Sequence, residues 1–409
     1  MQSLWRSSLR LKRRPGVFPI AFGTRPRWCL PAFAEQHPPL KPEAPALPDQ
    51  LLDPLSGFPC GRWNIQNDIG LRYEKEQVHW DRIKVMDVAE ISNDVQEIHD
   101  NNLIVADDIF PEDIFEGSSH RDGSIYKKKW KEWYGVDIAD RNETVSEIRK
   151  LSRDLDCYPD QENCICHGPS EMIQIFSLSL AKAPISSGSV QLYGYMAARD
   201  GMDGKLNYLF NRSRDDPVIM QQGSPIEMTG PKRGIMMLSD LLFEFDMRIK
   251  TGEKEENDKE VIDGVVHYSD RMVPFFPITV RIGGNSGGAV DMSLSLVESG
   301  VEAIIEVDIS EAWNTFNLSL SSIVCVAEVR KEVQIFSGSA SEMGIKRSVV
   351  AVPWDTTMYL KFKMGQKGSD TDVVRYYSFG AKLHGCSNRL IKLDLACISV
   401  KVTWSPPWF

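Results

Sequence analysis

The sequence predicts a mainly β protein: an antiparallel β-sandwich or flattened barrel at the C-terminus, with a small helical N-terminal extension. Two observations predict the sheets. Strand-like runs follow one another between residues 171 and 403. Turn residues separate these runs, and there are no helix-length connectors between them. The clearest run is 241–250, in which apolar and charged residues alternate from Phe243 onward. A period of two is typical of a strand with one solvent-facing side.

The predicted strands share apolar alternation or β-branched and aromatic enrichment. They are 172–181, 189–198, 205–211, 241–250, 261–268, 277–283, 289–297, 301–309, 322–336, 346–352, 357–364, 373–383 and 390–403. The acidic residues of 301–309 are expected to point outward. The apolar phase changes within 390–403, which predicts a β-bulge. The run 252–260 is so charged that we expect an exposed hairpin loop.

The first sixty residues differ in composition from the rest. Residues 1–34 hold seven basic groups and no acid, which predicts an organelle-addressing, transit-like segment or a disordered one. Residues 35–60 are proline-rich and are expected to form an extended linker.

Residues 61–170 are predicted to be helical or irregular. Apolar residues at three- and four-residue spacings predict a helix within 74–99. A capping box at Thr144 opens a shorter helix, and 107–113 is an acidic loop.

Composition excludes several classes of protein. Of the 409 residues 42% are apolar and 25% charged, as in soluble globular proteins, and no apolar run is long enough for a membrane span. Removing the seven basic groups of residues 1–34 from the 47 lysines and arginines leaves 40 against 57 acids, a net charge of −17. Such a body repels a phosphate backbone, so no nucleic acid is expected as a partner. The lysines of 127–131 could bind phosphate, but a solvated face is the favoured interpretation.

Eight cysteines are too few for a disulfide scaffold. Cys325 and Cys397 lie in strand patterns and are interpreted as reduced thiols, which favours an intracellular protein. The composition of residues 1–34 is compatible with a chloroplast or mitochondrial address and equally with a disordered extension; without such an address the protein would be cytoplasmic.

Ser286 is a candidate nucleophile. Gly284-Asn285-Ser286-Gly287-Gly288 fits the G-x-S-x-G pattern of a nucleophile elbow and resembles the serine loop of chymotrypsin-like peptidases. An elbow opens a helix, however, and the next segment, 289–297, is strand-like. His267 is only 19 residues away, and the earlier histidines lie in helical or irregular segments. A glycine-rich hairpin loop is therefore the favoured interpretation.

Four soft ligands lie close together and form a candidate zinc site: Cys157, Cys164, Cys166 and His167. Structural zinc sites usually place two to four residues between paired cysteines, and the Cys-x-Cys spacing is shorter. Incidental thiols in a loop are the favoured interpretation, and no cofactor is expected.

Arg212 and Arg214 are candidate ligand-binding residues because a pair of guanidinium groups can clamp a carboxylate or phosphate. Asp215 and Asp216 follow directly. Local pairing with these acids is the favoured interpretation.

Three blocks carry a family resemblance: Asn207–Pro217, Met228–Ile235 and Phe243–Lys250. Their order and spacing resemble the grass-plant proteins grouped as domain of unknown function 6598, and the resemblance extends to about residue 403. It implies a β-rich domain with no assigned activity. Some relatives are associated with an rRNA N-glycosidase domain, which has a Glu-x-x-Arg motif. No arginine of this sequence has a glutamate three residues before it, so depurination is not implied.

The leading hypothesis is a non-catalytic β-rich binding or interaction module of a plant family, with an unknown protein partner. Analogy with relatives implies a stress or defence setting, but a fold does not fix a function. A serine hydrolase using Ser286 is the alternative from another class. An rRNA N-glycosidase-associated protein is the third.

Overall fold

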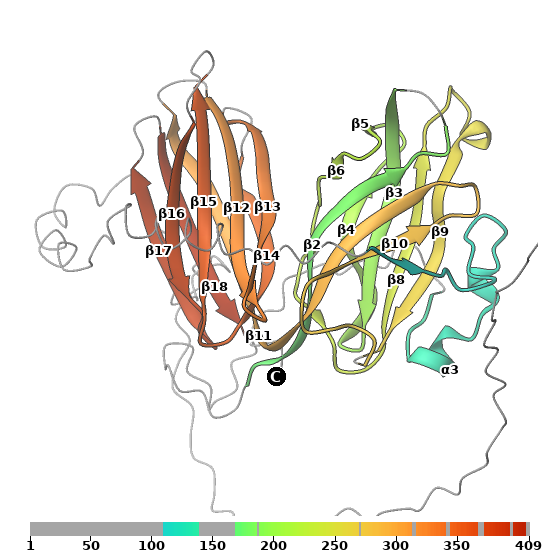
Figure 1. Ribbon diagram of the computed structural model, residues 1–409, viewed down its shortest axis with the longest axis horizontal. Helices are drawn as coiled ribbons and strands as arrows, with labels where there is room; N and C mark the ends of the chain where they lie inside the picture. Colours follow the sequence, from blue (N-terminus) through green and yellow to red (C-terminus); the bar gives the residue numbers. More distant parts are fainter. Residues whose placement is uncertain are drawn as a thin grey trace, which may run out of the picture. The chain divides into compact units, whose positions relative to one another are not determined.

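The computed structural model describes residues 109–138 and 168–405, apart from short gaps at 186–187, 270, 313–315, 341–343, 367–371 and 393–395. The described part is mostly β, as the sequence predicts (Figure 1). Its only α-helix is the five-residue α3 (Trp130–Tyr134). No helix of the described residues is long and apolar enough to cross a membrane. The helices predicted within 74–99 and from Thr144 onward lie outside the described residues.

The described strands form three sheets with free edges, so they make sandwiches and not a flattened barrel. The first sheet runs β4 (Asp203–Arg212), β3 (Ser189–Asp200), β8 (Leu241–Ile249), β9 (Lys259–Tyr268), with β5 (Val218–Gln221) beside β3. The second contains β1 (Ile109–Glu112), β10 (Ile278–Gly283), β11 (Ala289–Ala312), β18 (Ala396–Ser405), β17 (Gly385–Lys392), β2 (Ser170–Lys182), β6 (Pro225–Ile226), β7 (Ile235–Met236) and β14 (Lys346–Pro353). The third runs β13 (Val329–Ser339), β12 (Phe316–Val326), β15 (Thr357–Gln366), β16 (Val373–Gly380).

The long strand β11 belongs to two hydrophobic cores. Its first half pairs with β10 and β2, and its second half pairs with β14 and β18. The prediction of two strands, 289–297 and 301–309, is therefore wrong. Ser299 has a positive φ of 48°, and the register with β2 shifts at this point. Glu298, Ser299 and Gly300, which separate the two predicted strands, therefore lie at an irregularity within one strand and do not form a turn that reverses the chain.

Two predicted single strands are hairpins. Segment 322–336 belongs to β12 and β13, which meet at Ala327 and Glu328, both with positive φ as a tight hairpin turn requires. Segment 390–403 belongs to β17 and β18, where Ile391 pairs with Ile398. The change of apolar phase arises from this chain reversal and not from a β-bulge.

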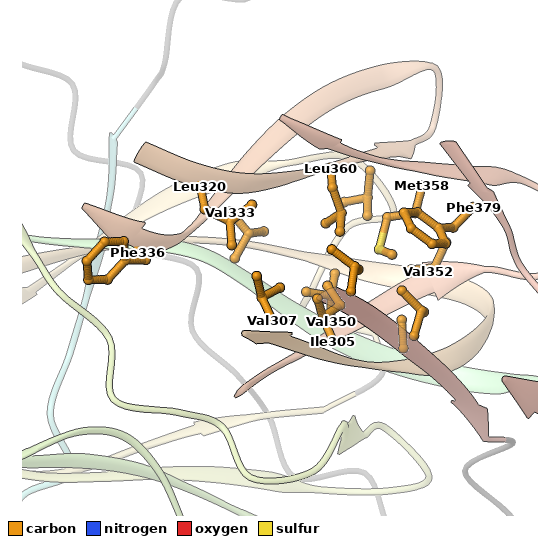
Figure 2. Close-up of a cluster of buried hydrophobic side chains, with 14 of the residues drawn as sticks. Ile305, Val307, Leu320, Val333, Phe336, Val350, Val352, Met358, Leu360 and Phe379 are labelled. Atoms are coloured by element: carbon orange, nitrogen blue, oxygen red, sulfur yellow. The ribbon is translucent and has the colours of Figure 1, made fainter. Parts of the chain in front are cut away.

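Each core lies between two sheets. In what we call the N-terminal sandwich, apolar residues of the first sheet pack against β2, β10 and the first half of β11. In the C-terminal sandwich, the third sheet packs against β14, β17, β18 and the second half of β11. Figure 2 shows Ile305 and Val307 of β11 and Val350 of β14 in this second cluster, together with Leu320 of β12 and Leu360 of β15.

The described cysteines differ in state. Cys325 and Cys397 are reduced, as predicted. Cys386 on β17 is disulfide-bonded.

β8 is buried on both faces, so the prediction of a solvent-facing side is wrong. Its apolar residues point into the N-terminal sandwich, while Glu244 and Asp246 lie on the opposite face and are buried too. We call residues 109–138 the cap, and its part from His120 to Ile138 packs on this face. Within the cap the predicted acidic loop 107–113 contributes β1, which pairs in parallel with β10. The run 252–260 is not wholly exposed either, because Asp258 and Glu260 are buried.

Candidate functional site

A small apolar cluster fixes the cap on the sheet. Ile125, Trp130, Val136 and Ile138 of the cap are buried against Leu242 of β8 and Val265 of β9. The indole Nε1 of Trp130 donates to the carbonyl oxygen of Ile125 at 2.6 Å, so the polar edge of this ring is satisfied. The cap is therefore a packed element of the N-terminal sandwich.

The cap also hydrogen-bonds the edge strand β9. Phe115 N donates to Val265 O at 2.9 Å, and Val265 N donates to Ser118 Oγ at 3.1 Å. Gly264 permits this approach: its φ is +142°, and a Cβ there would lie 2.5 Å from Ile114 Cγ2. The edge of the sheet is thereby covered.

His120 reaches from the cap into a buried ionic cluster. Its Nδ1 lies 2.7 Å from Asp263 Oδ1, and its Nε2 lies 3.0 Å from Glu244 Oε1. Its backbone N donates to the Asp263 carboxylate at 2.9 Å. The side chains of all three residues are at most 1% exposed. Asp263 also accepts from Ser119 Oγ at 2.5 Å, so it organises the whole turn that carries His120.

These contacts determine the charge of His120. Burial alone would lower the pKa of the imidazole, but hydrogen bonds to Asp263 and Glu244 outweigh it and raise the pKa above its ordinary value. Burial alone would raise the pKa of Asp263, yet hydrogen bonds from His120 and Ser119 lower it to about 2. The pKa of Glu244 is likewise lowered, despite its burial, by His120 and Arg199. The cluster thus contains an imidazolium between two carboxylates.

The second oxygen of Glu244 is paired with a fully buried guanidinium. Arg199 Nε donates to Glu244 Oε2 at 2.6 Å, and Arg199 Nη1 donates to Gly204 O at 2.6 Å. Tyr195 Oη donates to Glu244 Oε1 at 2.6 Å and lies 2.9 Å from His120 Nε2. Neighbouring β3 and β8 therefore supply most partners of the His120 ring.

Asp246 of β8 and Asp263 of β9 are direct cross-strand partners. Two like charges at such positions repel, so compensating cations are required. Arg248 donates to both oxygens of Asp246, at 2.7 and 3.0 Å, and His120 compensates Asp263.

His120, Asp246 and Asp263 each offer a ligand atom within 4.8 Å of the others, so this trio is a candidate metal centre. The geometry does not fit one well. Both ring nitrogens of His120 face carboxylates, and the Asp246 carboxylate is bound by Arg248. The positive charge that a divalent cation would bring is already present, so we interpret the trio as an ion-pair cluster.

The predicted ligand-binding arginines lie elsewhere. Arg212 pairs with Asp216 at 2.9 Å, on the surface. Arg214 donates to Asp258 at 2.7 Å, and Tyr193 donates to the same carboxylate at 2.6 Å. These bonds outweigh the effect of burial and lower the pKa of Asp258 to about 2. The two arginines have separate anions and do not form a joint clamp.

Ser286 lies on the exposed turn between β10 and β11, which are antiparallel. Glycines on both sides of it closely approach Val261, near the start of β9. His267 lies six residues further along β9, or about 20 Å at the rise of a strand, and contacts Asp240. The structure therefore does not bring Ser286 and His267 together. The candidate zinc ligands Cys157, Cys164, Cys166 and His167 lie outside the described residues.

The sequence contained a signal for the buried cluster. Glu244, Asp246 and Arg248 alternate with apolar residues. This alternation predicts that these three members of the cluster lie on one face of β8. What it could not reveal was the cap that covers them.

Residues 172–403 match the family described as "Domain of unknown function (DUF6598)", so the chain belongs to this family. No curated protein matches it. Among solved structures the chain is similar to human GIVD cytosolic phospholipase A2, at 9% identity and a TM-score of 0.19, over 59% of this chain and 33% of that one. It spans about a third of that chain's length. It is also similar to a pair of C2 domains of Extended-Synaptotagmin 2, at 7% identity and a TM-score of 0.20, over 65% and 99% of the two chains.

Proposed function

We propose that the chain is a non-catalytic binding protein and that its cap presents the contact surface for a protein partner. One observation carries the proposal: the acid–base groups that lie together are locked in buried ion pairs beneath the cap, while the cap exposes aromatic rings. Trp133 is 54% exposed, and Tyr126 and Phe115 are also exposed.

The buried cluster is poorly suited to catalysis. A general acid or base must come within hydrogen-bond reach of a substrate proton. The side chain of His120 is 1% exposed, and both of its nitrogens are engaged. The ion pairs of His120 with Glu244 and Asp263 instead hold the cap on the sheet, which is a positioning role.

The aromatic surface is suited to binding. The rings of Phe115, Trp130, Trp133 and Tyr134 are linked by centroid distances of 6.0 to 6.3 Å, so the exposed rings of Phe115 and Trp133 both contact the buried Trp130. Tryptophan and tyrosine are enriched among residues that dominate binding energy. A rigid aromatic surface loses little conformational entropy when a partner binds.

The test compares partner enrichment from native tissue extract by three proteins: the wild type, Trp133→Ala and Ile219→Ala. Ile219 on β5 is 73% exposed and serves as the matched control for an exposed apolar residue. We expect a defined protein that the wild type and Ile219→Ala retain and Trp133→Ala loses. Equal enrichment by all three would refute the cap as the contact surface.

The hydrolase alternative is tested on the same samples. A fluorophosphonate probe labels activated serines, so labelling of the wild type that Ser286→Ala abolishes would establish an enzyme. We expect no labelling, and no adenine release from ribosomes.

We also propose that residues 1–34 address the protein to an organelle of a plant cell, in a stress or defence setting. The basic, acid-free composition of this segment supports the organelle address, and the setting rests on analogy with relatives. A fluorescent fusion of the full chain should localise to chloroplasts or mitochondria, and removal of residues 1–34 should abolish this.

A further inference from the structure

The cap carries a run of lysines beside its exposed rings. Lys127, Lys129 and Lys131 are exposed and Lys128 is half-buried. Lys128, Lys129 and Lys131 line a hollow of about 150 Å³. The other residues that line it are Ile125, Tyr126, Trp130, Glu132, Asp137 and Ile138. We call residues 125–133 the lysine–aromatic surface.

Only part of this positive charge forms a salt bridge with another described residue. Lys129 pairs with Glu132 at 3.0 Å, and Lys128 Nζ lies 6.0 Å from the centroid of Trp133, within range of a cation–π interaction. Among the described residues Lys127 and Lys131 have no ion-pair partner. Lys127 interacts electrostatically with Asp122, but neither lysine is held in an ion pair with a described acid, so both can pair with an external anion.

The support beneath these lysines is rigid. Ile125 and Trp130, on either side of the run, are buried and joined by the 2.6 Å hydrogen bond from the indole. Gly135 ends α3 with a left-handed conformation and donates to Lys131 O. A surface ordered in advance gains affinity because less entropy is lost on binding.

The size and surroundings of the surface favour a short anion. The chain carries a net charge of −10, and the cap itself contains six acids, of which the last two line the hollow: Glu112, Asp113, Glu116, Asp122, Glu132 and Asp137. A long polyanion would have to extend past these acids, whereas a short one needs to reach only Lys127 and Lys131. The exposed ring of Trp133 offers a contact for an apolar side chain, because aromatic residues are enriched at protein interfaces.

Resting on the proposed binding function, we propose that the lysine–aromatic surface binds a short acidic polypeptide segment of the partner. Its carboxylates pair with Lys127 and Lys131, and an apolar side chain packs on Trp133. The interaction is steered by charge and weakens as salt rises.

The test measures fluorescence anisotropy of three labelled probes with the full chain: a peptide of a dozen Glu, Asp and Leu residues, a single-stranded RNA of similar length, and vesicles containing phosphatidylserine. We expect saturable, salt-sensitive binding of the peptide. The double variant Lys127→Glu/Lys131→Glu should weaken it by about tenfold or more. The control Lys182→Glu/Lys205→Glu changes two lysines that are exposed on β2 and β4, and it should bind like the wild type.

Absence of peptide binding, an equal affinity of the two double variants, or tighter binding of RNA or vesicles would overturn the proposal. Thermal melting of each variant verifies folding. The outcome is separable from that of the proposed function. If Trp133→Ala loses a tissue partner while no acidic peptide binds, the partner class is wrong and the binding function stands. If no partner depends on Trp133, the proposed function itself fails.

Discussion

His120 and Asp263 are 143 residues apart in the sequence and are joined by hydrogen bonds through both the imidazole Nδ1, at 2.7 Å, and the backbone N, at 2.9 Å. One carboxylate thus binds a side chain and the turn that carries it. The contact attaches the cap to the edge strand β9, and the lysine–aromatic surface depends on this attachment.

Replacing His120 with alanine should destabilise the N-terminal sandwich by about 3–5 kcal/mol, because Asp263 and Glu244 are left buried without their shared cation. Urea denaturation followed by tryptophan fluorescence measures the loss, and hydrogen exchange shows whether amides of 109–138 open first. Arg281→Ala is the control: its bidentate pair with Asp291 is similarly short, at 2.7 Å, but Arg281 is 45% exposed. Its removal should cost no more than about 1 kcal/mol. Equal losses in the two variants would contradict a special role for the buried pair.

The cluster also predicts a pH dependence. The pKa of His120 is raised, so its contribution to stability is complete below its unfolded pKa of about 6.5 and is lost as pH rises through the higher folded value. The pKa values of Asp263 and Glu244 are lowered, so their contribution is present above their unfolded values of about 4 and is lost as pH falls through the folded ones.

Stability of the cap should therefore be greatest between about pH 4 and 6.5 and decline on both sides. Hydrogen exchange of 109–138, corrected for the intrinsic effect of pH, measures this profile. His120→Gln should abolish the alkaline decline. An alkaline decline that persists in His120→Gln would assign it to another group.

Most strands could be predicted from the sequence because alternation over eight or more residues is a local property. β3, β8 and β15 follow the predicted ranges closely. The failures concern which segments pair. The break in the apolar pattern near Ser299 lies within the continuous strand β11, whereas the break at Ala327 and Glu328 is a hairpin turn between β12 and β13. Only the strands that each segment pairs with distinguish the two cases.

The buried cluster could be predicted only in part. Glu244 and Asp246 alternate with Phe243 and Phe245 in the same way whether their carboxylates meet water or an imidazolium. The distinction depends on His120, which approaches from a segment more than a hundred residues earlier. Chain topology, which local periodicity does not encode, decides the burial of these charges.

Gly264 controls how closely the cap approaches β9. An alanine Cβ would lie 2.5 Å from Ile114 and 2.7 Å from Ser118 Oγ, and the positive φ adds backbone strain. Gly264→Ala should therefore increase hydrogen exchange in the cap and lower the melting temperature. Gly252→Ala provides the matched control, since its φ is +82° and nothing lies within 4 Å of the added Cβ. If Gly264→Ala and Gly252→Ala change hydrogen exchange of the cap equally, steric contact between the added Cβ and the cap does not explain the change.

Trp130 and Trp133 separate the stability of the cap from its recognition surface. Trp130 is 3% exposed and donates to Ile125 O, so Trp130→Ala should cost about 3–5 kcal/mol through lost packing. Trp133 is 54% exposed, and Trp133→Ala should change stability by no more than about 0.5 kcal/mol. Denaturant unfolding measures both losses, and acidic-peptide binding is measured on the same samples. Because Trp133 is expected to contact the partner directly, its variant should retain the wild-type melting curve and lose affinity. If Trp133→Ala keeps both the wild-type stability and the wild-type affinity for the acidic peptide, the exposed ring contributes neither to stability nor to recognition.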